Sequence, residues 1–183
     1  MKDQRRLLVV LGVTDLLKVV YKIRDLDISR LYDVYKESLE LAARHCRFDC
    51  PENLKILYAK QDFYGYLNEF LSDERSFYAL WIVDGLYKAA LRIEPYMDGL
   101  LLSGLETAPE SRNLGYAKAL VNAVCSEIPG VRTACVYSHV DKANLTSLAV
   151  HQACGFRRLK ECANYIDGSV LTSSCTMVRY SEY

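Results

Sequence analysis

The sequence has no excess of either charge. Its 183 residues contain 23 Lys and Arg and 23 Asp and Glu, so the formal net charge is zero. Proteins that bind nucleic acid do so largely with Lys and Arg that neutralise phosphates, and attraction to an anionic membrane likewise needs a positive surface. We therefore expect neither a nucleic-acid partner nor a membrane.

Prolines, linkers and long apolar runs are also scarce. The chain has four prolines and no Pro/Gly/Ser-rich linker, internal repeat or low-complexity segment. No stretch approaches the roughly 18 apolar residues of a transmembrane helix. Hydrophobic residues make up 51% of the chain and charged residues 25%, as in ordinary globular proteins. Length and composition thus predict one globular domain.

The seven cysteines do not suit a complete disulfide framework, because their number is odd. Several lie in apolar runs, which is typical of free buried thiols in a reducing cytosol, so we expect a cytoplasmic protein. His45, Cys46 and Cys50 form the only metal-like cluster, and no second Cys/His pair follows at zinc-site spacing. We expect no metal.

The N-terminal segment superficially resembles a secretion signal, since Arg5 and Arg6 precede the apolar stretch from Leu7 to Val13. The apolar run is short, however, and no A-x-A-like cleavage site follows it. We interpret residues 1–17 as an N-terminal arm or extra strand, with an added strand, a dimer arm and a disordered tail left open. Residues 18–183 are then the single domain.

In the first part of the domain, the sequence pattern predicts a strand and two helices. Residues Lys18 to Ile23 are rich in Val, Ile and Tyr, which favours a strand. Asp27 is a suitable N-cap for a helix that runs to about Arg44, and apolar residues at helical spacing predict a second helix from Leu54 to Leu71.

Asp-Gly pairs predict the hairpins, because a type I′ turn needs a positive φ at both central residues. Asp84-Gly85 and Asp98-Gly99 would make a meander of Phe77–Val83, Leu86–Tyr96 and Leu100–Thr107, and Asp167-Gly168 would join Leu159–Ile166 to Val170–Tyr180.

Between the meander and the last hairpin, the pattern predicts a helix from Tyr116 to Ile128, a strand from Arg132 to His139 and a short helix from Asn144 to Gly155. The order β, α, α, β, β, β, α, β, α, β, β predicts a mixed α/β (α+β) domain. The two strands joined by the Tyr116–Ile128 helix should be parallel.

One segment carries recognisable chemistry. The strand Leu100–Thr107 leads through residues 108–111 to Arg112 and then to Gly115, which opens a helix. The first N–H groups of a helix lack intrahelical partners, and the helix dipole adds positive charge there, so such a start can bind a phosphate. Gly115 would let the backbone approach closely, and Arg112 would add a full charge. An ordinary helix start, whose glycine only turns the chain, is the alternative.

Two motifs resemble those of the GNAT acyltransferase superfamily. Arg112-x-x-Gly115-x-Ala117 matches its Q/R-x-x-G-x-G/A signature, and Thr107-x-Pro109-x-x-Arg112 resembles the V-x-P-x-x-R lead-in. Residues 144–156, NLTSLAVHQACGF, resemble the second landmark N-x-x-[SA]-x-x-x-[YH]-x-x-x-G-F. The resemblance covers roughly Lys18 to Tyr180. It implies a central, mostly antiparallel sheet that splays between two strands and is flanked by about four helices.

The resemblance implies N-acetyl transfer from acetyl-CoA to a primary amine of a small molecule, peptide or protein, by direct attack in a ternary complex. Pantetheine would pair with the splayed strand near Leu105, Glu106 and Thr107. Asn144 would reach the pantetheine arm or simply cap its helix. The pyrophosphate would lie on the backbone of Asn113, Leu114, Gly115, Tyr116 and Ala117, beside Arg112. A non-catalytic acyl-CoA sensor on the same fold is the alternative function, and an interaction protein with a fortuitous motif is a third.

The catalytic and acceptor groups are less defined. His151 stands where many family members have a tyrosine near the CoA sulfur; it would protonate the thiolate or only pack beside the cofactor. Glu106 is a candidate base. Arg92 and Glu94 share a strand face and form either a surface ion pair or part of the acceptor site, and His139 could line the slot or be structural.

We expect the acceptor pocket to draw on the two early helices and the first hairpin, where Trp81 and several tyrosines gather; these are Tyr64, Tyr66, Tyr78 and Tyr87. Trp81, Arg92 and Glu94 are the candidate substrate residues. The acceptor's identity, the acyl length and the oligomeric state, a homodimer included, stay open.

Overall fold

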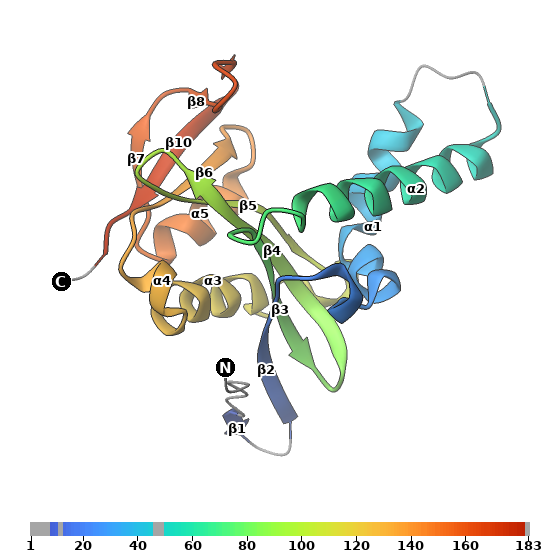
Figure 1. The fold of residues 1–183 in the computed structure, drawn as a ribbon, viewed down its shortest axis with the longest axis horizontal. Coiled ribbons are helices and arrows are strands. Elements are labelled where there is room, and N and C mark those ends of the chain that lie inside the picture. The colour runs from blue at the N-terminus through green and yellow to red at the C-terminus, as the bar shows by residue number, and fades with distance from the viewer. Residues whose placement is uncertain (1–7, 11–12, 46–49, 182–183) are drawn as a thin grey trace.

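The structure, a computed structural model, describes residues 8–10, 13–45 and 50–181 of the chain. Its main sheet has eight strands in the order β1-β2-β3-β4-β5-β6-β10-β7 (Figure 1). Every pair of neighbours is antiparallel except β5 and β6, which are parallel. The strands are β1 (Leu8–Val10), β2 (Val13–Val20), β3 (Phe77–Val83), β4 (Leu86–Tyr96), β5 (Gly99–Thr107), β6 (Val136–Asp141), β7 (Arg157–Lys160) and β10 (Ser174–Arg179), with a separate hairpin of β8 (Ala163–Asn164) and β9 (Val170–Leu171).

Helices cover both faces of the sheet. They are α1 (Ile28–Arg44), α2 (Glu52–Phe70), α3 (Tyr116–Glu127), the short α4 (Pro129–Arg132) and α5 (Leu145–Ala153), with 3-10 turns η1 (Ile23–Asp25) and η2 (Pro109–Ser111). The mixed α/β class and the mostly antiparallel sheet are confirmed, as is the parallel pair joined through α3. Among the described residues, no helix is long and apolar enough to span a membrane.

The core has three clusters, of which the smallest contains Tyr96, Leu101, Tyr137 and Val178, and strand alternation separates the two large ones. Leu91 and Ile93 of β4 belong to the cluster beneath α3 and α5, whereas Tyr78 and Leu80 of β3 pack with α1 and α2. The two helix pairs lie on opposite sides of the sheet in Figure 1. Alternate side chains of a central strand therefore face opposite sides of the sheet, and this decides which residues share a site.

Two predicted strands are displaced in the structure. The strand predicted at Lys18–Ile23 is β2, Val13–Val20, and Ile23–Asp25 forms a 3-10 turn. The boundary drawn after residue 17 thus falls inside β2, and β1 adds a short edge strand before it. The strand predicted from Arg132 begins later, at Val136, because the short helix α4 precedes it. Pro129 suits the first position of that helix, where the N–H group that proline lacks would have no partner.

The Asp98-Gly99 turn is shifted by one residue. Met97 has a φ of +49° and Gly99 already pairs with Tyr96 as part of β5, so the loop is Met97-Asp98. Gly99 is required for another reason: a Cβ atom there would lie 2.2 Å from the carbonyl oxygen of Cys135. The Asp84-Gly85 turn, with φ of +50° and +75°, is as predicted.

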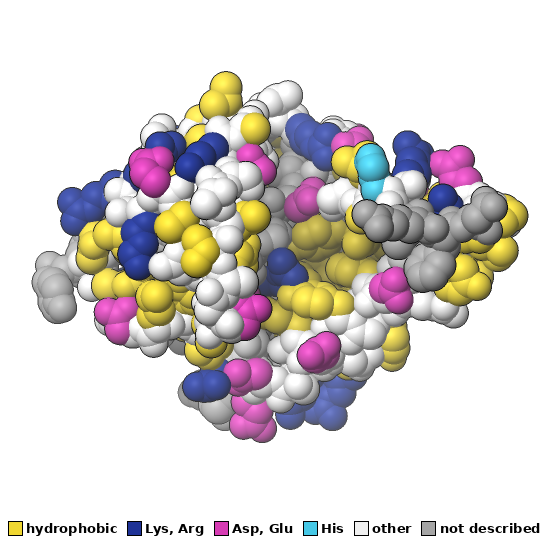
Figure 2. Space-filling model, turned by 90° about the horizontal axis from the view of Figure 1, so that it is seen from above, with side chains coloured by type: hydrophobic (Ala, Val, Ile, Leu, Met, Phe, Trp, Pro, Cys, Tyr) yellow, Lys and Arg dark blue, Asp and Glu magenta, His cyan; other side chains and the backbone are white. Residues whose placement is uncertain are grey.

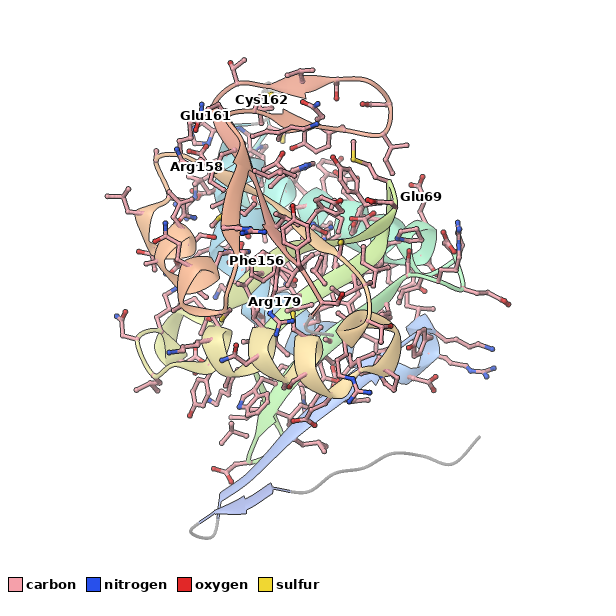
Figure 3. All side chains as sticks on the ribbon, turned by 90° about the vertical axis from the view of Figure 1, so that its left-hand side faces the viewer. Glu69, Phe156, Arg158, Glu161, Cys162 and Arg179 are labelled. Atoms are coloured by element: carbon pink, nitrogen blue, oxygen red, sulfur yellow. The ribbon has the colours of Figure 1, made fainter. Side chains whose placement is uncertain are left out.

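The last predicted hairpin is divided into two. Gly168, with a φ of +84°, closes the small β8–β9 hairpin, while β7 and β10 pair outside it. Figure 3 labels Glu161 and Cys162 at the base of this small hairpin, which stands beyond the end of the main sheet. Thr176 of β10 donates a 2.7 Å hydrogen bond to the carbonyl oxygen of Cys162 and so ties the hairpin to the sheet. The six cysteines that the structure describes are all free.

Candidate acyl-transfer site

The strands β5 and β6 pair only at their beginnings. Leu100, Leu101 and Leu102 face Val136, Tyr137 and Ser138 across the parallel ladder. Beyond these pairs, residues 103–107 of β5 and 139–141 of β6 pair only with the outer neighbours β4 and β10. The inner edges of both strands therefore present backbone N–H and C=O groups to a slot, where an extended amide-containing chain can bond to them.

The slot leads to an unpaired helix start. Gly115 is the N-cap of α3 with a φ of +84°, a conformation that favours glycine, and no side chain caps the helix. Among the described residues, no group accepts a hydrogen bond from the backbone N–H groups of residues 113–118. A Cβ atom on Gly115 would meet no atom within 4 Å. This turn has the free donors, the dipole and the open space that a phosphate needs.

Two side chains predicted to help the cofactor have partners within the protein. Arg112 Nη1 lies 2.6 Å from Glu37 Oε2 of α1, so its charge ties the loop to that helix as a half-exposed ion pair. The side-chain oxygen of Asn144 accepts a 2.9 Å hydrogen bond from the N–H of Ser147. The capping role of Asn144, one of the two alternatives, is thus the one that the structure contains.

A bulge at Gly104 bends β5 where the slot opens. The register between β4 and β5 shifts between Ala90 and Arg92, and Gly104 has a φ of +56°. Tyr35 of α1 donates a 2.6 Å hydrogen bond to the carbonyl oxygen of Gly104. A Cβ atom on Gly104 would lie 2.6 Å from Arg92 Nε, so the glycine is required both by its backbone and by its neighbour. The sequence pattern missed Gly104 and Tyr35, since no turn motif marks the bulge.

His151 is buried, and both of its ring nitrogens lie close to polar groups of the protein. Its side chain is 2% exposed. Nδ1 lies 2.8 Å from the carbonyl oxygen of Ser147, which can only accept, and Nε2 lies 3.0 Å from Ser138 Oγ. The ring packs edge-on against Phe156, which Figure 3 labels near the middle of the molecule, above α3. Burial lowers the pKa of His151 below its ordinary 6.5, which favours the neutral imidazole, a much weaker acid than the imidazolium. This geometry favours the packing alternative over the acid role.

A large cavity lies between the first two helices and the sheet. It has a volume of about 860 Å³, and its walls are mainly apolar and aromatic. Figure 2 shows a hollow on this face, with hydrophobic side chains around it and a basic side chain inside. We call it the helix-side cavity; its walls include Tyr35, Leu39, Tyr58, Phe63, Tyr66, Tyr78, Arg92, Gly104 and Glu106.

Glu106 lies in the helix-side cavity. Burial raises the pKa of its carboxyl above the ordinary 4.5, against the lowering influence of the Ser38 hydroxyl and of Arg112. The side chain of Glu106 faces the opposite side of the sheet from Leu105, which packs against the core beneath α3. Leu105 and Thr107 thus flank a carboxylate that points toward the acceptor side.

A second cavity of about 490 Å³ adjoins the first. We call it the hairpin-side cavity, because the tip of the β8–β9 hairpin closes it. It shares Arg92 and Gly104 with the helix-side cavity. Its other lining residues are Glu94, Tyr96, Leu101, Ser103, His139, Tyr165, Ile166 and Asp167.

His139 is the first residue of β6 after the last β5–β6 pair. Its ring lies between Tyr96 and Tyr165, with centroid distances of 5.3 and 4.9 Å. Both ring nitrogens are buried, and neither has a hydrogen-bond partner among the residues that the structure describes. Burial lowers the pKa of His139 below 6.5, so the ring is neutral at pH 7. A neutral imidazole with a free nitrogen at the mouth of the slot can accept a proton.

The structure brings Arg92 and Glu94, but not Trp81, to the walls of the two cavities. In the regular part of β3, residues 78 and 81 have opposite orientations, and Trp81 packs against the core beneath α3. It lines neither cavity, so the structure does not bring it together with Arg92 and Glu94, and its role as a substrate residue stays a prediction. Tyr66 and Tyr78 do line the helix-side cavity, whereas Tyr64 and Tyr87 do not.

No metal site accompanies these cavities. Within residues 8–10, 13–45 and 50–181, no three His, Cys, Asp or Glu side chains gather so that they could hold a metal ion. Cys46, one member of the cluster considered in the sequence, lies outside the described residues.

Comparison with known proteins agrees with this architecture. The model of the acetyltransferase (GNAT) family matches residues 29–156. The chain is similar in fold to the ribosomal-protein-S18-alanine N-acetyltransferase of Escherichia coli, with 16% identity, a TM-score of 0.58 and coverage of 91% of this chain and 96% of that one. No curated protein sequence matches the chain.

Two similar structures contain the cofactor. The PaiA N-acetyltransferase of Thermoplasma acidophilum, in complex with coenzyme A, has 14% identity and a TM-score of 0.61, with coverage of 90% and 98%. The PseH N-acetyltransferase of Campylobacter jejuni, in complex with acetyl coenzyme A, has 13% identity and a TM-score of 0.61, with coverage of 92% and 99%. Because the family match spans more than half of the chain and the fold agrees with it, this protein belongs to the acetyltransferase (GNAT) family.

Proposed function

We propose that the protein is an N-acetyltransferase that transfers the acetyl group of acetyl-CoA to a primary amine. The observation that carries this proposal is the open β5–β6 slot, whose free backbone edges lead to the unpaired N–H groups of residues 113–118. Similar structures contain CoA or acetyl-CoA, and the donors present here suit both an amide-containing arm and a phosphate.

Acetyl-CoA supplies an acetyl thioester, an acyl group that a neutral amine can attack directly. The inner edge of β5, from Ser103 to Thr107, orients the arm by backbone pairing, and the start of α3 holds the pyrophosphate. The backbone beyond the Gly104 bulge supplies N–H groups to the thioester carbonyl as its oxygen becomes negative. The amine nitrogen bonds to the carbonyl carbon, the carbon–sulfur bond breaks, and the amine loses its proton.

His139 is our candidate for the base. It is neutral at pH 7, has free ring nitrogens and lies beside the bulge in the hairpin-side cavity. Glu106 is the second candidate, because it is a carboxylate of raised pKa on the acceptor side. The thiolate takes its proton from solvent, since both nitrogens of His151 are occupied. A thiol pKa near 8.5 makes that transfer easy at neutral pH.

The experiment is acetyl transfer measured as free thiol release from acetyl-CoA, with a panel of amines that includes amino acids, arylalkylamines and peptides. We expect turnover with at least one class and a loss of about 100-fold in kcat for His139→Gln, the usual range for a general base. Glu106→Gln tests the second candidate. His45→Gln is the matched control, because His45 lies at the exposed end of α1.

The outcomes separate the functions. Tight acetyl-CoA binding without turnover of any amine would favour the non-catalytic acyl-CoA sensor. Turnover that survives His139→Gln but not Glu106→Gln would transfer the base role to Glu106. No binding of acetyl-CoA would contradict both functions.

A further inference from the structure

Arg92 lies where the two cavities meet. It and Gly104 are the residues that line both the helix-side and the hairpin-side cavity. The guanidinium group lies against Gly104, since a Cβ atom there would be within 2.6 to 2.9 Å of three of its atoms. A charged group is thus fixed beside the bulge at which the acyl-transfer slot opens.

The protein holds this guanidinium rigidly with aromatic groups. Arg92 Nη1 donates a hydrogen bond to the Tyr66 hydroxyl. The guanidinium carbon lies 4.9 Å from the centroid of the Tyr66 ring and 5.8 Å from that of Phe70. Such contacts orient a cation but leave its charge uncompensated.

Arg92 forms no ion pair with the described residues, although Glu106 and Glu94 each line one of its two cavities and interact with its charge. Among the described residues, no carboxylate oxygen lies within 4.0 Å of its nitrogens. Its Nε is buried and makes no hydrogen bond. Glu94, the nearest acid along β4, instead accepts a 3.0 Å hydrogen bond from Ser103. A partly buried cation is costly without a counter-charge, and a bound carboxylate would supply it through the paired geometry that arginine favours.

The helix-side cavity next to Arg92 fits an apolar group. Its volume of about 860 Å³ and its wall of aromatic and aliphatic side chains are of the kind that encloses a small organic ligand. On the other side of Arg92, the hairpin-side cavity contains His139 and Ser103. One residue therefore separates an apolar compartment from the compartment with the candidate base.

Resting on the proposed function, we propose that the acceptor is an α-amino acid with a large apolar side chain. Arg92 binds its α-carboxylate, the helix-side cavity takes its side chain, and its α-amine is directed toward His139 and the slot. The α-amine and the carboxylate share one carbon, which matches a cation placed directly beside the bulge. An amine without a carboxylate would leave Arg92 unpaired and should be a poor acceptor.

The first test compares three acceptors with the wild-type protein. Acetyl transfer is measured with L-phenylalanine, L-phenylalaninamide and phenethylamine, which share the aromatic side chain and the amine but differ in the carboxylate. We expect kcat/KM for L-phenylalanine to exceed that for the other two by about 100-fold, the effect of losing one buried charge-pair partner. L-leucine and L-tryptophan test other apolar side chains in the same assay. Equal rates for the three phenyl acceptors, or no turnover of any amino acid, would overturn the proposal.

The second test changes the arginine. In Arg92→Gln the ratio of kcat/KM for L-phenylalanine to that for phenethylamine should fall by about 100-fold. The fall should be smaller in Arg92→Lys, which keeps the charge but loses the paired N–H donors of the guanidinium group. Arg75→Gln is the matched control, because Arg75 is a surface residue whose ion-pair partner is Asp73. A ratio that is the same in wild type and Arg92→Gln would contradict the assignment. Thermal unfolding shows whether each variant is folded.

A binding measurement separates this proposal from the proposed function. Calorimetric titration with 3-phenylpropionate, which has the carboxylate and ring but no amine, needs neither acetyl-CoA nor turnover. Binding by wild type that weakens at least about 10-fold in Arg92→Gln supports the carboxylate site, even if acetyl-CoA does not bind and the proposed function fails. If acetyl-CoA binds but 3-phenylpropionate binds equally well to both proteins, the acceptor class is wrong and the function stands.

Discussion

The two sides of the slot are built by different means. On the cofactor side, backbone groups provide the site: the free edge of β5 and the N–H groups of residues 113–118. On the acceptor side, side chains from distant segments provide it, with Arg92, His139 and Tyr35 coming from three separate elements. A backbone site tolerates many sequences but depends on a few glycines, whereas a side-chain site can change its substrate through single residues. We therefore expect substitutions of glycines to weaken cofactor binding, and substitutions of polar side chains to change which acceptor is used.

The largest effect should come from Gly115→Glu. The new side chain would occupy the open space at the start of α3, strain a φ of +84° and place a negative charge at the proposed phosphate site. Acetyl-CoA affinity measured by calorimetry should fall by about 100-fold or more, since several charge-assisted hydrogen bonds are lost. Gly168→Glu is the control, because Gly168 has the same φ of +84° and equally open surroundings. Equal losses in the two variants would mean that strain alone explains the result.

A change at Gly104 should affect both sides at once. In Gly104→Ala, the Cβ atom would collide with Arg92 and the backbone would be strained at a φ of +56°. We expect kcat/KM to fall by about 10- to 100-fold, because small displacements at the reacting groups are costly. Gly65→Ala in α2 meets no atom within 4 Å and should instead add up to about 1 kcal/mol of stability. Unchanged activity in Gly104→Ala would refute the role of the bulge.

The pH dependence of activity separates the acceptor side from the cofactor side. Burial lowers the pKa of His139 below its ordinary 6.5, so the base becomes protonated at more acidic pH than a free histidine. When kcat/KM is divided by the fraction of the acceptor amine that is neutral, it should rise with pH through this lowered pKa and then level off, while acetyl-CoA affinity should not follow the same curve. His139→Gln should remove that acidic limb. A limb that persists in His139→Gln would assign it to another group.

His151 should affect the pH dependence of stability, whereas His139 should affect the pH dependence of activity. Because burial lowers its pKa in the folded protein, the unfolded chain takes up a proton first as pH falls below 6.5. The stabilisation is therefore complete above about pH 6.5 and is lost as pH falls through the folded-state pKa. His151→Gln should lower the free energy of unfolding at pH 7 by about 1–3 kcal/mol, because it leaves the Ser138 and Ser147 groups unpaired. Its stability should also decline less toward acid pH than that of the wild type. The variant for comparison is His139→Gln, because His139 lines the hairpin-side cavity.

The smallest effect should come from Tyr35→Phe. This change removes one hydrogen bond to the Gly104 carbonyl, which contributes about 1 kcal/mol, so a reduction of a few-fold in kcat/KM is expected. Tyr58→Phe, on the exposed part of the same cavity, should have less effect. A larger loss in Tyr58→Phe than in Tyr35→Phe would contradict the proposed support of the bulge.

The same contrast explains how much the sequence predicted. The helix start at Gly115 is one contiguous segment, so its motif indicated both the local structure and its chemistry. The acceptor side depends on which faces the strands present and on a bulge that no local pattern marks. Strand alternation separates Tyr78 from Trp81, and only the described fold shows that Tyr78 faces the cavity. His151 and its neighbour Ser147 lie in one recognised motif, but the contact with Ser138 of β6 comes from the three-dimensional packing.

Thermal unfolding of the wild-type protein with and without acetyl-CoA tests the central proposal most directly, with ATP as a control that offers phosphates without the pantetheine arm. Acetyl-CoA at ~100 times its dissociation constant stabilises by about 2.7 kcal/mol, which for a domain of this size is a rise of roughly 5–11 °C in the unfolding midpoint. We predict that rise with acetyl-CoA, little with ATP, and its loss in Gly115→Glu. An unfolding midpoint that no CoA ester changes would contradict the assignment of the slot.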